Sequence, residues 1–373
     1  MKEKVTNLIV GCGLSGMVLA ERLATVKNED VLIIDKRDHI AGNIYDYKDA
    51  DTGITVHRYG PHVFHTDNEK VWQYLSRFTT WHRFMPRVKA VIDGKEVNIP
   101  FNLDSLYLVF PESLARRLEE KLLAHFEFNQ KVPILELRKA QDKDLAFLAQ
   151  YIYQKVFLGY TVKQWGIKPE NLDPSVSARV PVFIGRDDRY FQDKYQAVAQ
   201  EGYSAMARNM LNNPLISVRL NTDFRSIKDT ITYKRLFFTG AIDAFFDYQF
   251  GALAYRSLDI VFQTYPVAYF QSGMQLNFPE NYDYTRSIEY KYFLDEKSDR
   301  TVVSYEYPVP FEEGKNERFY PILNADNMNV YNRYVAQTKN LKNVYFCGRL
   351  AEYKYYDMDD AVARALSCFE EVV

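Results

Sequence analysis

Short apolar runs, most of them followed by glycine, occur near the N-terminus, around residue 239 and near the C-terminus. Residues 8–10 form one such run, and the helical spacing of Leu19 and Leu23 follows the glycines after it. A second apolar run, VLIID, ends in Asp35. Further runs end at Thr239-Gly240 and in the segment VYFCGR. The order strand, glycine turn, helix and strand predicts a parallel α/β sheet.

The middle of the chain shows patterns typical of amphipathic helices, of a hairpin and of antiparallel strands. An apolar residue recurs at every fourth position within 112–128, which predicts an amphipathic helix, and a second helix is expected over 145–158. Asp93-Gly94 separates two apolar runs and predicts a hairpin. Residues 259–307 are rich in β-branched and aromatic residues, which predicts successive antiparallel strands.

Composition narrows the class of protein. The chain has 373 residues and a formal net charge of -2, so no global field favours nucleic acid or an anionic membrane. Its 3 cysteines are too few for a disulfide framework. Apolar runs are too short for a signal peptide core or a membrane span, so we expect a cytoplasmic protein without membrane insertion.

The first glycine turn carries the clearest chemistry. Gly11, Gly13 and Gly16 have the G-x-G-x-x-G spacing between a strand and a helix, and Asp35 ends the next strand. The glycines allow a tight turn, close approach of a pyrophosphate and close helix–strand packing, while the acid can accept hydrogen bonds from a ribose. A glycine turn in an unrelated α/β domain is the alternative.

The later glycine junctions favour FAD over NAD. An NAD site needs little beyond the first βαβ unit, whereas FAD needs further loops to reach its ribityl chain and ring. Each later junction alone is compatible with an ordinary strand exit. Three junctions on one ligand fit a flavoprotein better than a simple dehydrogenase.

We therefore expect an α/β fold with a discontinuous Rossmann-like FAD-binding domain and two further domains. The FAD-binding domain is expected over residues 1–80, 195–250 and 325–373, a helical domain over 100–178, an antiparallel sheet domain over 81–99 and 251–324, and a mobile lid over 179–202.

Four separated motifs give the chain a family resemblance. HRYGPHVFHT, GYTVKQWG, YTRSIE and GRLAEYKYYDMD, in this order, closely resemble the UDP-galactopyranose mutase family. The resemblance implies a flavin-dependent isomerase that interconverts UDP-galactopyranose and UDP-galactofuranose for cell-surface polysaccharide synthesis. It also implies that N5 of reduced FAD forms a covalent adduct with C1 of the sugar.

The resemblance assigns residues to a substrate site. Arg179 and Arg286 are expected to bind the diphosphate and to act in catalysis, because guanidinium groups form strong bonds with phosphate oxygens. Tyr160 is expected to stack on uracil. The remaining expected substrate contacts are Thr161, Trp165, Tyr190, Asn277, Tyr320 and Tyr355.

A second set of residues is expected around FAD. His62 is expected beside the flavin as a catalytic residue, and Asp357 is expected to cap a helix whose N-terminus faces the anionic edge of the reduced ring. The full cofactor set is Gly11, Gly13, Leu14, Ser15, Gly16, Asp35, Lys36, Asn43, His62, Thr239, Gly240, Arg349, Asp357, Met358 and Asp359.

Ordinary structural roles compete with several of these assignments. A single arginine is usually a solvated surface charge, and Trp165 or Tyr320 could be core aromatics. His57, His62 and His65 lack the helical spacing and the accompanying acids or thiols of a metal site, so we expect no metal. Cys12 and Cys347 are expected to be small buried side chains.

Partners and rival functions follow from the resemblance. We expect a UDP-sugar substrate, an external reductant such as NAD(P)H, no nucleic acid and a homodimer. Arg58 and Pro86 depart from the family pattern near the sugar, so UDP-N-acetylgalactosamine mutase or dual-specificity activity stays open. An amine-oxidase-like flavin oxidoreductase and a non-catalytic binding module are the more distant alternatives.

Overall fold

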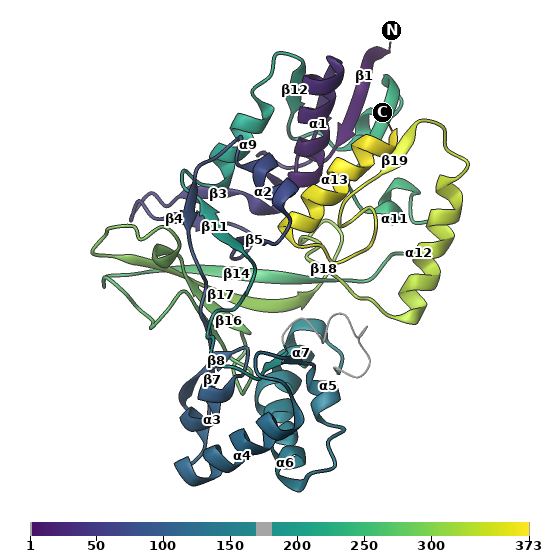
Figure 1. Ribbon diagram of the computed structural model, residues 1–373. Helices are drawn as coiled ribbons and strands as arrows, with labels where there is room; N and C mark the ends of the chain where they lie inside the picture. The colour runs from purple at the N-terminus through teal and green to yellow at the C-terminus, as the bar shows by residue number, and fades with distance from the viewer. Residues whose placement is uncertain (1, 169–180, 373) are drawn as a thin grey trace. The chain divides into compact units, whose positions relative to one another are not determined.

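A computed structural model describes residues 2–168 and 181–372 of the chain (Figure 1). The chain divides into two compact units, each built from discontinuous segments. Unit 1 comprises Met1–Phe84, Asp193–Ala254 and Ala325–Val373, and unit 2 comprises Met85–Gln192 and Tyr255–Asn324. Both units therefore draw on distant parts of the sequence.

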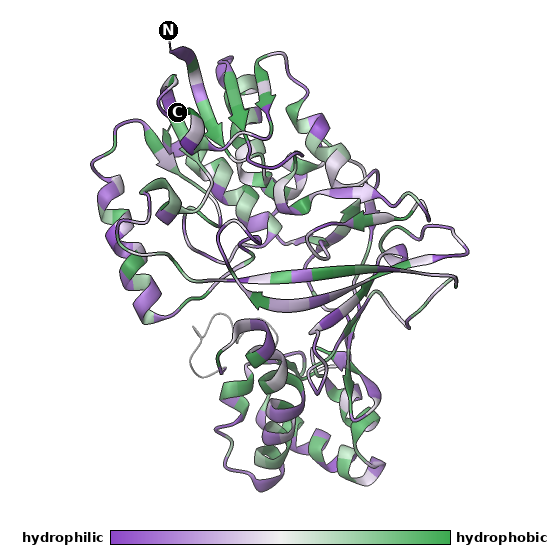
Figure 2. Ribbon diagram, turned by 180° about the vertical axis from the view of Figure 1, so that it is seen from behind, coloured by the Kyte–Doolittle hydropathy of each residue, from purple (hydrophilic) through white to green (hydrophobic). Residues whose placement is uncertain are grey.

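Unit 1 contains a five-stranded parallel sheet in the order β12-β2-β1-β13-β19. The strands are β1 (Glu3–Val10), β2 (Val31–Ile34), β12 (Ile216–Arg219), β13 (Ile231–Phe238) and β19 (Val344–Phe346). Strand β2 is buried along its whole length, as its continuous apolar sequence predicts for a central parallel strand. The apolar strands of this sheet are green in Figure 2.

Helices and two small sheets complete unit 1. The helices are α1 (Leu14–Lys27), α2 (Glu69–Leu75), α9 (Tyr203–Leu211), α10 (Phe224–Ile227), α11 (Ile242–Phe245), α12 (Ala325–Thr338) and α13 (Met358–Val372), with a 3-10 turn η1 (Gly42–Ile44). One small sheet has the order β5-β11-β6, with β5 (Phe64–Thr66), β11 (Tyr195–Ala199) and β6 (Trp81–Arg83), and the other pairs β3 (Asp46–Lys48) with β4 (Thr55–His57). Helix α13 packs against α1, so the C-terminal segment completes the N-terminal βαβ unit.

Unit 2 contains a seven-stranded sheet in the order β18-β14-β17-β16-β15-β7-β8. Its strands are β7 (Val88–Ile92), β8 (Lys95–Ile99), β14 (Tyr255–Tyr265), β15 (Gln275–Asn277), β16 (Arg286–Glu289), β17 (Thr301–Pro310) and β18 (Tyr320–Pro321). All neighbours are antiparallel except β15 and β7. Within residues 259–307, predicted as successive strands, the segment TRSIEYKYFL forms a strand only as far as Glu289 and continues as a 3-10 turn, η4 (Tyr290–Phe293).

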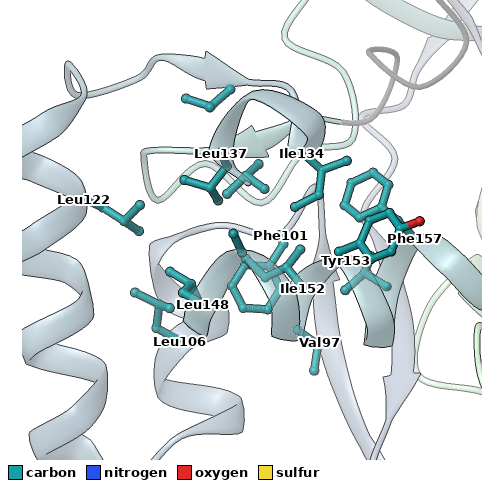
Figure 3. Close-up of a cluster of buried hydrophobic side chains, with 14 of the residues drawn as sticks. Val97, Phe101, Leu106, Leu122, Ile134, Leu137, Leu148, Ile152, Tyr153 and Phe157 are labelled. Atoms are coloured by element: carbon teal, nitrogen blue, oxygen red, sulfur yellow. The ribbon is translucent and has the colours of Figure 1, made fainter. Parts of the chain in front are cut away.

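The helices of unit 2 share a core with the β7–β8 hairpin. They are α3 (Leu103–Val109), α4 (Glu112–His125), α5 (Ile134–Leu137), α6 (Lys143–Ile152), the π-helical turn η2 (Tyr153–Leu158) and α7 (Gly159–Trp165), joined by the strand pair β9 (Lys131–Val132) and β10 (Val182–Phe183). Figure 3 shows Val97 of the hairpin close to Ile152, and the same apolar cluster includes Leu122 and Leu148 of these helices. One apolar cluster therefore joins helices and sheet.

This shared core corrects the predicted domain division. The helical segment and the antiparallel sheet, expected as two domains, form one compact unit. Strand β7 is hydrogen-bonded to β15 of the sheet, and its apolar side chains pack against the helices. The expected Rossmann-like domain corresponds to unit 1, whose boundaries differ from the predicted ones by a few residues.

The range predicted as a lid, 179–202, crosses the boundary between the units. Its first two residues lie outside the described part of the chain, and β10 and β11 within it are hydrogen-bonded to neighbouring strands. Gly202 precedes α9 with a φ of 84°, and the Asp46 carboxylate accepts the N–H groups of Tyr203 and Ser204 there. The mobility of this range stays a prediction.

Two adjacent leucines on α4 test the helical core. Leu122 is buried and Leu123 is 42% exposed. We expect Leu122→Ala to lower the free energy of unfolding by about 2–4 kcal/mol, because it leaves a cavity in the core. Leu123→Ala should change it by less than about 0.5 kcal/mol. Urea denaturation of both variants checks this, and equal losses would contradict the described packing.

Candidate functional site

Three strand ends converge at the glycine turn of unit 1. The backbone N–H of Gly11 donates to the Ile34 carbonyl at 2.8 Å, and that of Thr239 donates to the Val10 carbonyl at 2.9 Å. The N–H of Cys347 donates to the Phe238 carbonyl at 3.2 Å. The ends of β1, β13 and β19 therefore meet, as the three glycine junctions predicted. Topology explains the convergence, because parallel strands place their carboxyl ends at one edge of a sheet.

The glycines at this edge let neighbouring parts of the chain approach so closely that any side chain would clash. A Cβ on Gly11, which has a φ of 104°, would lie 2.1 Å from Thr239 Oγ1, and one on Gly16 would lie 2.0 Å from the Gly11 carbonyl oxygen. A Cβ on Gly42 would lie 2.7 Å from Gly13 Cα. A cradle formed by bare backbone, with the N-terminus of α1 behind it, fits the pyrophosphate of a dinucleotide.

The second half of the cradle comes from the C-terminal segment. Gly348 has a φ of 102°, and a Cβ there would lie 2.9 Å from Ser15 Oγ. The Glu352 carboxylate accepts the Gly348 N–H at 2.9 Å and the Arg364 Nε–H at 2.7 Å, which orients the loop after β19. Leu14 and Ser15 form the first turn of α1, and Gly240 follows Thr239.

Asp35 is held firmly at the end of β2. Its carboxylate accepts the backbone N–H of Cys12 at 2.7 Å and that of Arg37 at 2.9 Å. Asn43, in turn, accepts a hydrogen bond from Arg37 at 2.9 Å, and Lys36 is exposed. This geometry fits the expected ribose contact by Asp35, since a carboxylate has lone pairs beyond two hydrogen bonds.

His62 lies in a short histidine and glycine turn between β4 and β5. Its Nδ1 is 2.9 Å from the Gly60 carbonyl, and its backbone N–H donates to His57 Nδ1 at 3.0 Å. His57 is buried, and its burial lowers its pKa to about 3. The neutral ring of His57 therefore fixes the backbone that carries His62.

The segment after Gly348 contains the remaining residues expected around the flavin. The Arg349 guanidinium lies over the Tyr355 ring at 4.6 Å. Helix α13 begins at Met358, as predicted, and the Ala361 N–H donates to the Asp357 carbonyl at 3.0 Å. The Asp359 carboxylate accepts the Thr66 hydroxyl at 2.7 Å, which ties the helix to β5. Tyr355, expected to contact substrate, belongs to unit 1.

Unit 2 contains a row of three polar side chains across its sheet. Asn277 on β15 is opposite Arg286 on β16, which is opposite Glu306 on β17. Residues opposite one another on adjacent strands point to the same face. Arg286 Nε donates to Glu306 Oε2 at 2.5 Å, and Gln275 donates to the Asn277 amide oxygen at 2.8 Å. Both predicted substrate residues are therefore oriented by a neighbour.

The Arg286–Glu306 pair is buried but leaves the arginine open on one side. The Arg286 side chain is 18% exposed and that of Glu306 is 0% exposed. Burial disfavours the charge on Arg286, but Glu306, Tyr320 and Tyr160 together outweigh burial and raise the Arg286 pKa. Burial also raises the pKa of Glu306, and Arg286 opposes that shift. The guanidinium stays charged, and within the described residues only its Nε is bonded to protein, so both Nη groups can bind an anion.

Helix α7 brings the aromatic residues of its motif beside this pair. Burial raises the pKa of the Tyr160 hydroxyl, with smaller electrostatic contributions from the nearby Arg286, Tyr190, Tyr320 and Glu306. The rings of Trp165 and Tyr320 lie 5.5 Å apart. Thr161 is half-buried on the same helix. The π-helical turn η2 directly precedes α7, and such turns are frequent at functional sites.

The structure brings together most of the expected substrate residues of unit 2. Tyr160, Trp165, Asn277, Arg286 and Tyr320 share this region with Tyr190, whose N–H donates to the Pro86 carbonyl at 2.7 Å. Arg179 lies outside the described residues, so its expected role stays a prediction. Glu306 was missed, because its place opposite Arg286 depends on the pairing of β16 with β17, which the segment SYEYP alone does not specify.

Among residues 2–168 and 181–372, no helix is long and apolar enough to cross a bilayer. Nor does any cluster of three or more histidine, cysteine, aspartate or glutamate residues there have the arrangement of a metal site.

Comparisons with known proteins agree on a family. The family model described as UDP-galactopyranose mutase matches residues 155–355, and a model of NAD(P)-binding Rossmann-like domains matches residues 9–78. A probable UDP-galactopyranose mutase of Klebsiella pneumoniae is 36% identical over 98% of this chain and 94% of its own length.

The chain belongs to the UDP-galactopyranose mutase family. It is an isomerase of the nucleotide-sugar mutase kind, and its cofactor is FAD. A crystal structure of reduced UDP-galactopyranose mutase covers 99% of this chain and 93% of its own, with a TM-score of 0.76 at 13% identity, which supports the expected α/β fold. A dTDP-fucopyranose mutase of Escherichia coli is 35% identical over 97% of this chain and 96% of its own.

The buried His57 predicts a specific loss of stability in acid. An unfolded chain protonates this histidine below about pH 6.5, whereas the folded protein keeps it neutral down to about pH 3. The unfolded state then binds more protons, so this contribution to stability falls as pH falls through that window.

His57→Asn tests this reasoning, because the amide oxygen can still accept the His62 N–H while the side chain no longer titrates. Between pH 7 and pH 5, the free energy of unfolding of the wild type should fall by about 2 kcal/mol more than that of the variant. Urea denaturation at both pH values measures the difference, and parallel losses would contradict a buried neutral His57.

Proposed function

We propose that this chain interconverts UDP-galactopyranose and UDP-galactofuranose with reduced FAD bound in unit 1 and the nucleotide bound by unit 2. The observation that carries the proposal is Arg286, held through Nε by Glu306 beside Tyr160, with neither Nη group bonded to protein within residues 2–168 and 181–372. Membership of the mutase family supplies the reaction class. When bound and reduced, FAD supplies the nucleophilic nitrogen, N5, for the anomeric carbon of the sugar.

The residues of unit 2 act on the leaving nucleotide. Breaking the bond between the sugar and UDP puts negative charge on the diphosphate, and the two Nη groups of Arg286 can stabilise that charge with charge-assisted bonds. Arg179 is proposed as the second diphosphate ligand. Retention of UDP near the sugar allows the bond to re-form after the ring has changed size.

Aromatic and amide groups position the substrate. Tyr160 is proposed to stack on the base, since a ring held at one face of a helix offers a flat apolar surface. Asn277 is proposed to donate from its amide nitrogen, because Gln275 occupies the amide oxygen. Trp165, Tyr190 and Tyr320 are proposed to enclose the substrate, with Thr161 as a further nucleotide contact.

The residues of unit 1 are proposed to bind FAD. The glycine cradle would hold the pyrophosphate, and Asp35 the adenosine ribose. His62 and Arg349 would lie at the flavin ring. The N-terminus of α13, at Asp357 to Asp359, would direct N–H groups toward an anionic ring edge.

A second candidate substrate is dTDP-fucopyranose. The chain is 35% identical to a dTDP-fucopyranose mutase and 36% identical to a probable UDP-galactopyranose mutase, over nearly its whole length in both cases. These similarities do not separate the two nucleotides. UDP-N-acetylgalactosamine is a third substrate to test, because Arg58 and Pro86 depart from the family pattern.

The reductant, the location and the oligomeric state of the protein are also proposals. NAD(P)H is proposed as the external reductant because the reaction itself yields no electrons. A cytoplasmic location is proposed because the reaction needs nucleotide sugars made in that compartment, and a homodimer is proposed from the family resemblance alone.

Turnover under controlled reduction tests the proposed function. The FAD-loaded protein should convert UDP-galactofuranose to UDP-galactopyranose after dithionite reduction and not before, as measured by anion-exchange chromatography. dTDP-fucofuranose and the furanose form of UDP-N-acetylgalactosamine serve as parallel substrates. Faster conversion of either would replace the proposed substrate, and no conversion of any under reduction would contradict the mutase proposal.

Arg286→Ala supplies the matched control for that assay. Turnover should fall at least about 100-fold, because the leaving diphosphate loses its charge partner. FAD content should not change, because Arg286 belongs to unit 2 and the proposed FAD residues belong to unit 1. An equal loss of FAD would show that Arg286 has been assigned to the wrong ligand.

A further inference from the structure

Lys163 lies within the GYTVKQWG motif but has no role in the function proposed above. It is on α7, between Tyr160 and Trp165. Its side chain is not directed to an acidic partner, unlike those of Lys89, Lys121 and Lys155 in the same unit. Instead it reaches the loop that joins β15 to β16, residues 278–285.

Four backbone carbonyls of this loop surround the Lys163 ammonium. Nζ donates to the carbonyl oxygens of Glu280 at 3.0 Å, Tyr282 at 3.1 Å and Tyr284 at 3.3 Å, and also to that of Phe278. An ammonium has three N–H groups, so these carbonyls use its full donor capacity. Burial lowers the pKa of Lys163 to about 8, with Asp283 opposing the shift, so the side chain is still mostly charged at neutral pH.

A second contact fixes the same helix against the same loop. Gly159 precedes Lys163 by one turn, and a Cβ on Gly159 would lie 2.1 Å from the Pro279 carbonyl oxygen. Residues four apart lie on one face of a helix. Gly159 and Lys163 therefore form the face of α7 that contacts the loop. Thr285, at the end of the loop, donates to the Gln164 side chain at 3.3 Å.

The ends of this loop are the two predicted substrate residues of the sheet. Asn277 is the last residue of β15, and Arg286 is the first residue of β16. On the other side of the contact, α7 carries Tyr160 and Trp165. The spacing between the aromatic residues and the residues proposed to bind the diphosphate therefore depends on how the loop sits on α7.

We propose that Lys163 is a positioning residue for nucleotide binding: its ammonium binds the carbonyls of the 278–285 loop and thereby holds Asn277 and Arg286 at a fixed position relative to α7. The identity of the ligand rests on the proposed function. Lys163 acts through the backbone and touches no substrate. Removal of its charge releases the loop, so Arg286 loses its fixed distance from Tyr160.

Nucleotide titration of the FAD-loaded, full-length protein tests this role. UDP and dTDP are titrated into wild type, Lys163→Met and Lys121→Met by calorimetry. Lys121 is the matched control, because it is a helical lysine of the same unit that pairs with Asp142 at the surface. Lys163→Met should weaken binding of the preferred nucleotide by about tenfold, and Lys121→Met by less than twofold.

A double-mutant cycle separates positioning from general destabilisation. In an Arg286→Ala background, Lys163→Met should weaken binding by less than about twofold, because the residue that Lys163 positions is already absent. A similar tenfold loss in both backgrounds would overturn the proposal and leave Lys163 a purely structural residue. Unchanged binding in Lys163→Met would overturn it as well.

A second variant covers the case in which Lys163→Met does not fold. Gly159→Ala moves the loop at the neighbouring contact and should give the same Arg286-dependent loss of affinity. FAD absorbance and thermal unfolding establish that each variant is folded.

These experiments distinguish failure of the proposed role of Lys163 from failure of the proposed mutase function. A wild type that binds UDP or dTDP but turns over no sugar nucleotide would contradict the function, while the cycle would still decide the role of Lys163. A wild type that is an active mutase with a Lys163→Met variant of normal affinity would contradict the role of Lys163 alone. Binding of neither nucleotide by the wild type would overturn both.

Discussion

A buried arginine can bind an external anion only if another group keeps it charged and fixed. Arg286 meets that requirement because Glu306, on the next strand, takes its Nε and is itself fully buried. A buried ion pair contributes little to stability compared with apolar packing, so such a pair more often serves orientation. The remaining Nη groups are aligned by the guanidinium plane, and this alignment is what the proposed chemistry requires of unit 2.

The rest of unit 2 can be understood as support for that arrangement. The antiparallel register places Asn277, Arg286 and Glu306 in one row, and η2 and α7 bring Tyr160 beside it. The loop around Lys163 then connects the helix to the strands through backbone atoms. Unit 1 is organised differently, since the cradle proposed for its ligand is made by glycines where strands end rather than by paired side chains.

Local patterns made unit 1 the easier part to predict. The glycine turn, the acid at the end of β2 and the start of α13 each depend on a few adjacent residues, and all three were expected from the sequence. The meeting of Thr239 with Gly11 also followed, because parallel strands end at one edge. The Asp46 cap on α9 was not expected, since its partners are about 157 residues away in the chain.

The features of unit 2 that the sequence did not predict depend on contacts between distant parts of the chain. Arg286 was found through a family motif, but its partner Glu306 depends on the register of two strands, which a single sequence does not specify. Helices and sheet were assigned to separate domains because their patterns differ, whereas one apolar cluster joins them. Lys163 was missed because its partners are carbonyl groups, which every residue has.

A crystal structure of the FAD-loaded protein with the nucleoside diphosphate that it binds tests the central claim most directly. The account predicts diphosphate oxygens within hydrogen-bond distance of the Arg286 Nη groups while Nε remains on Glu306. A diphosphate bound away from Arg286, or an Arg286 side chain that leaves Glu306 to reach it, would contradict the account.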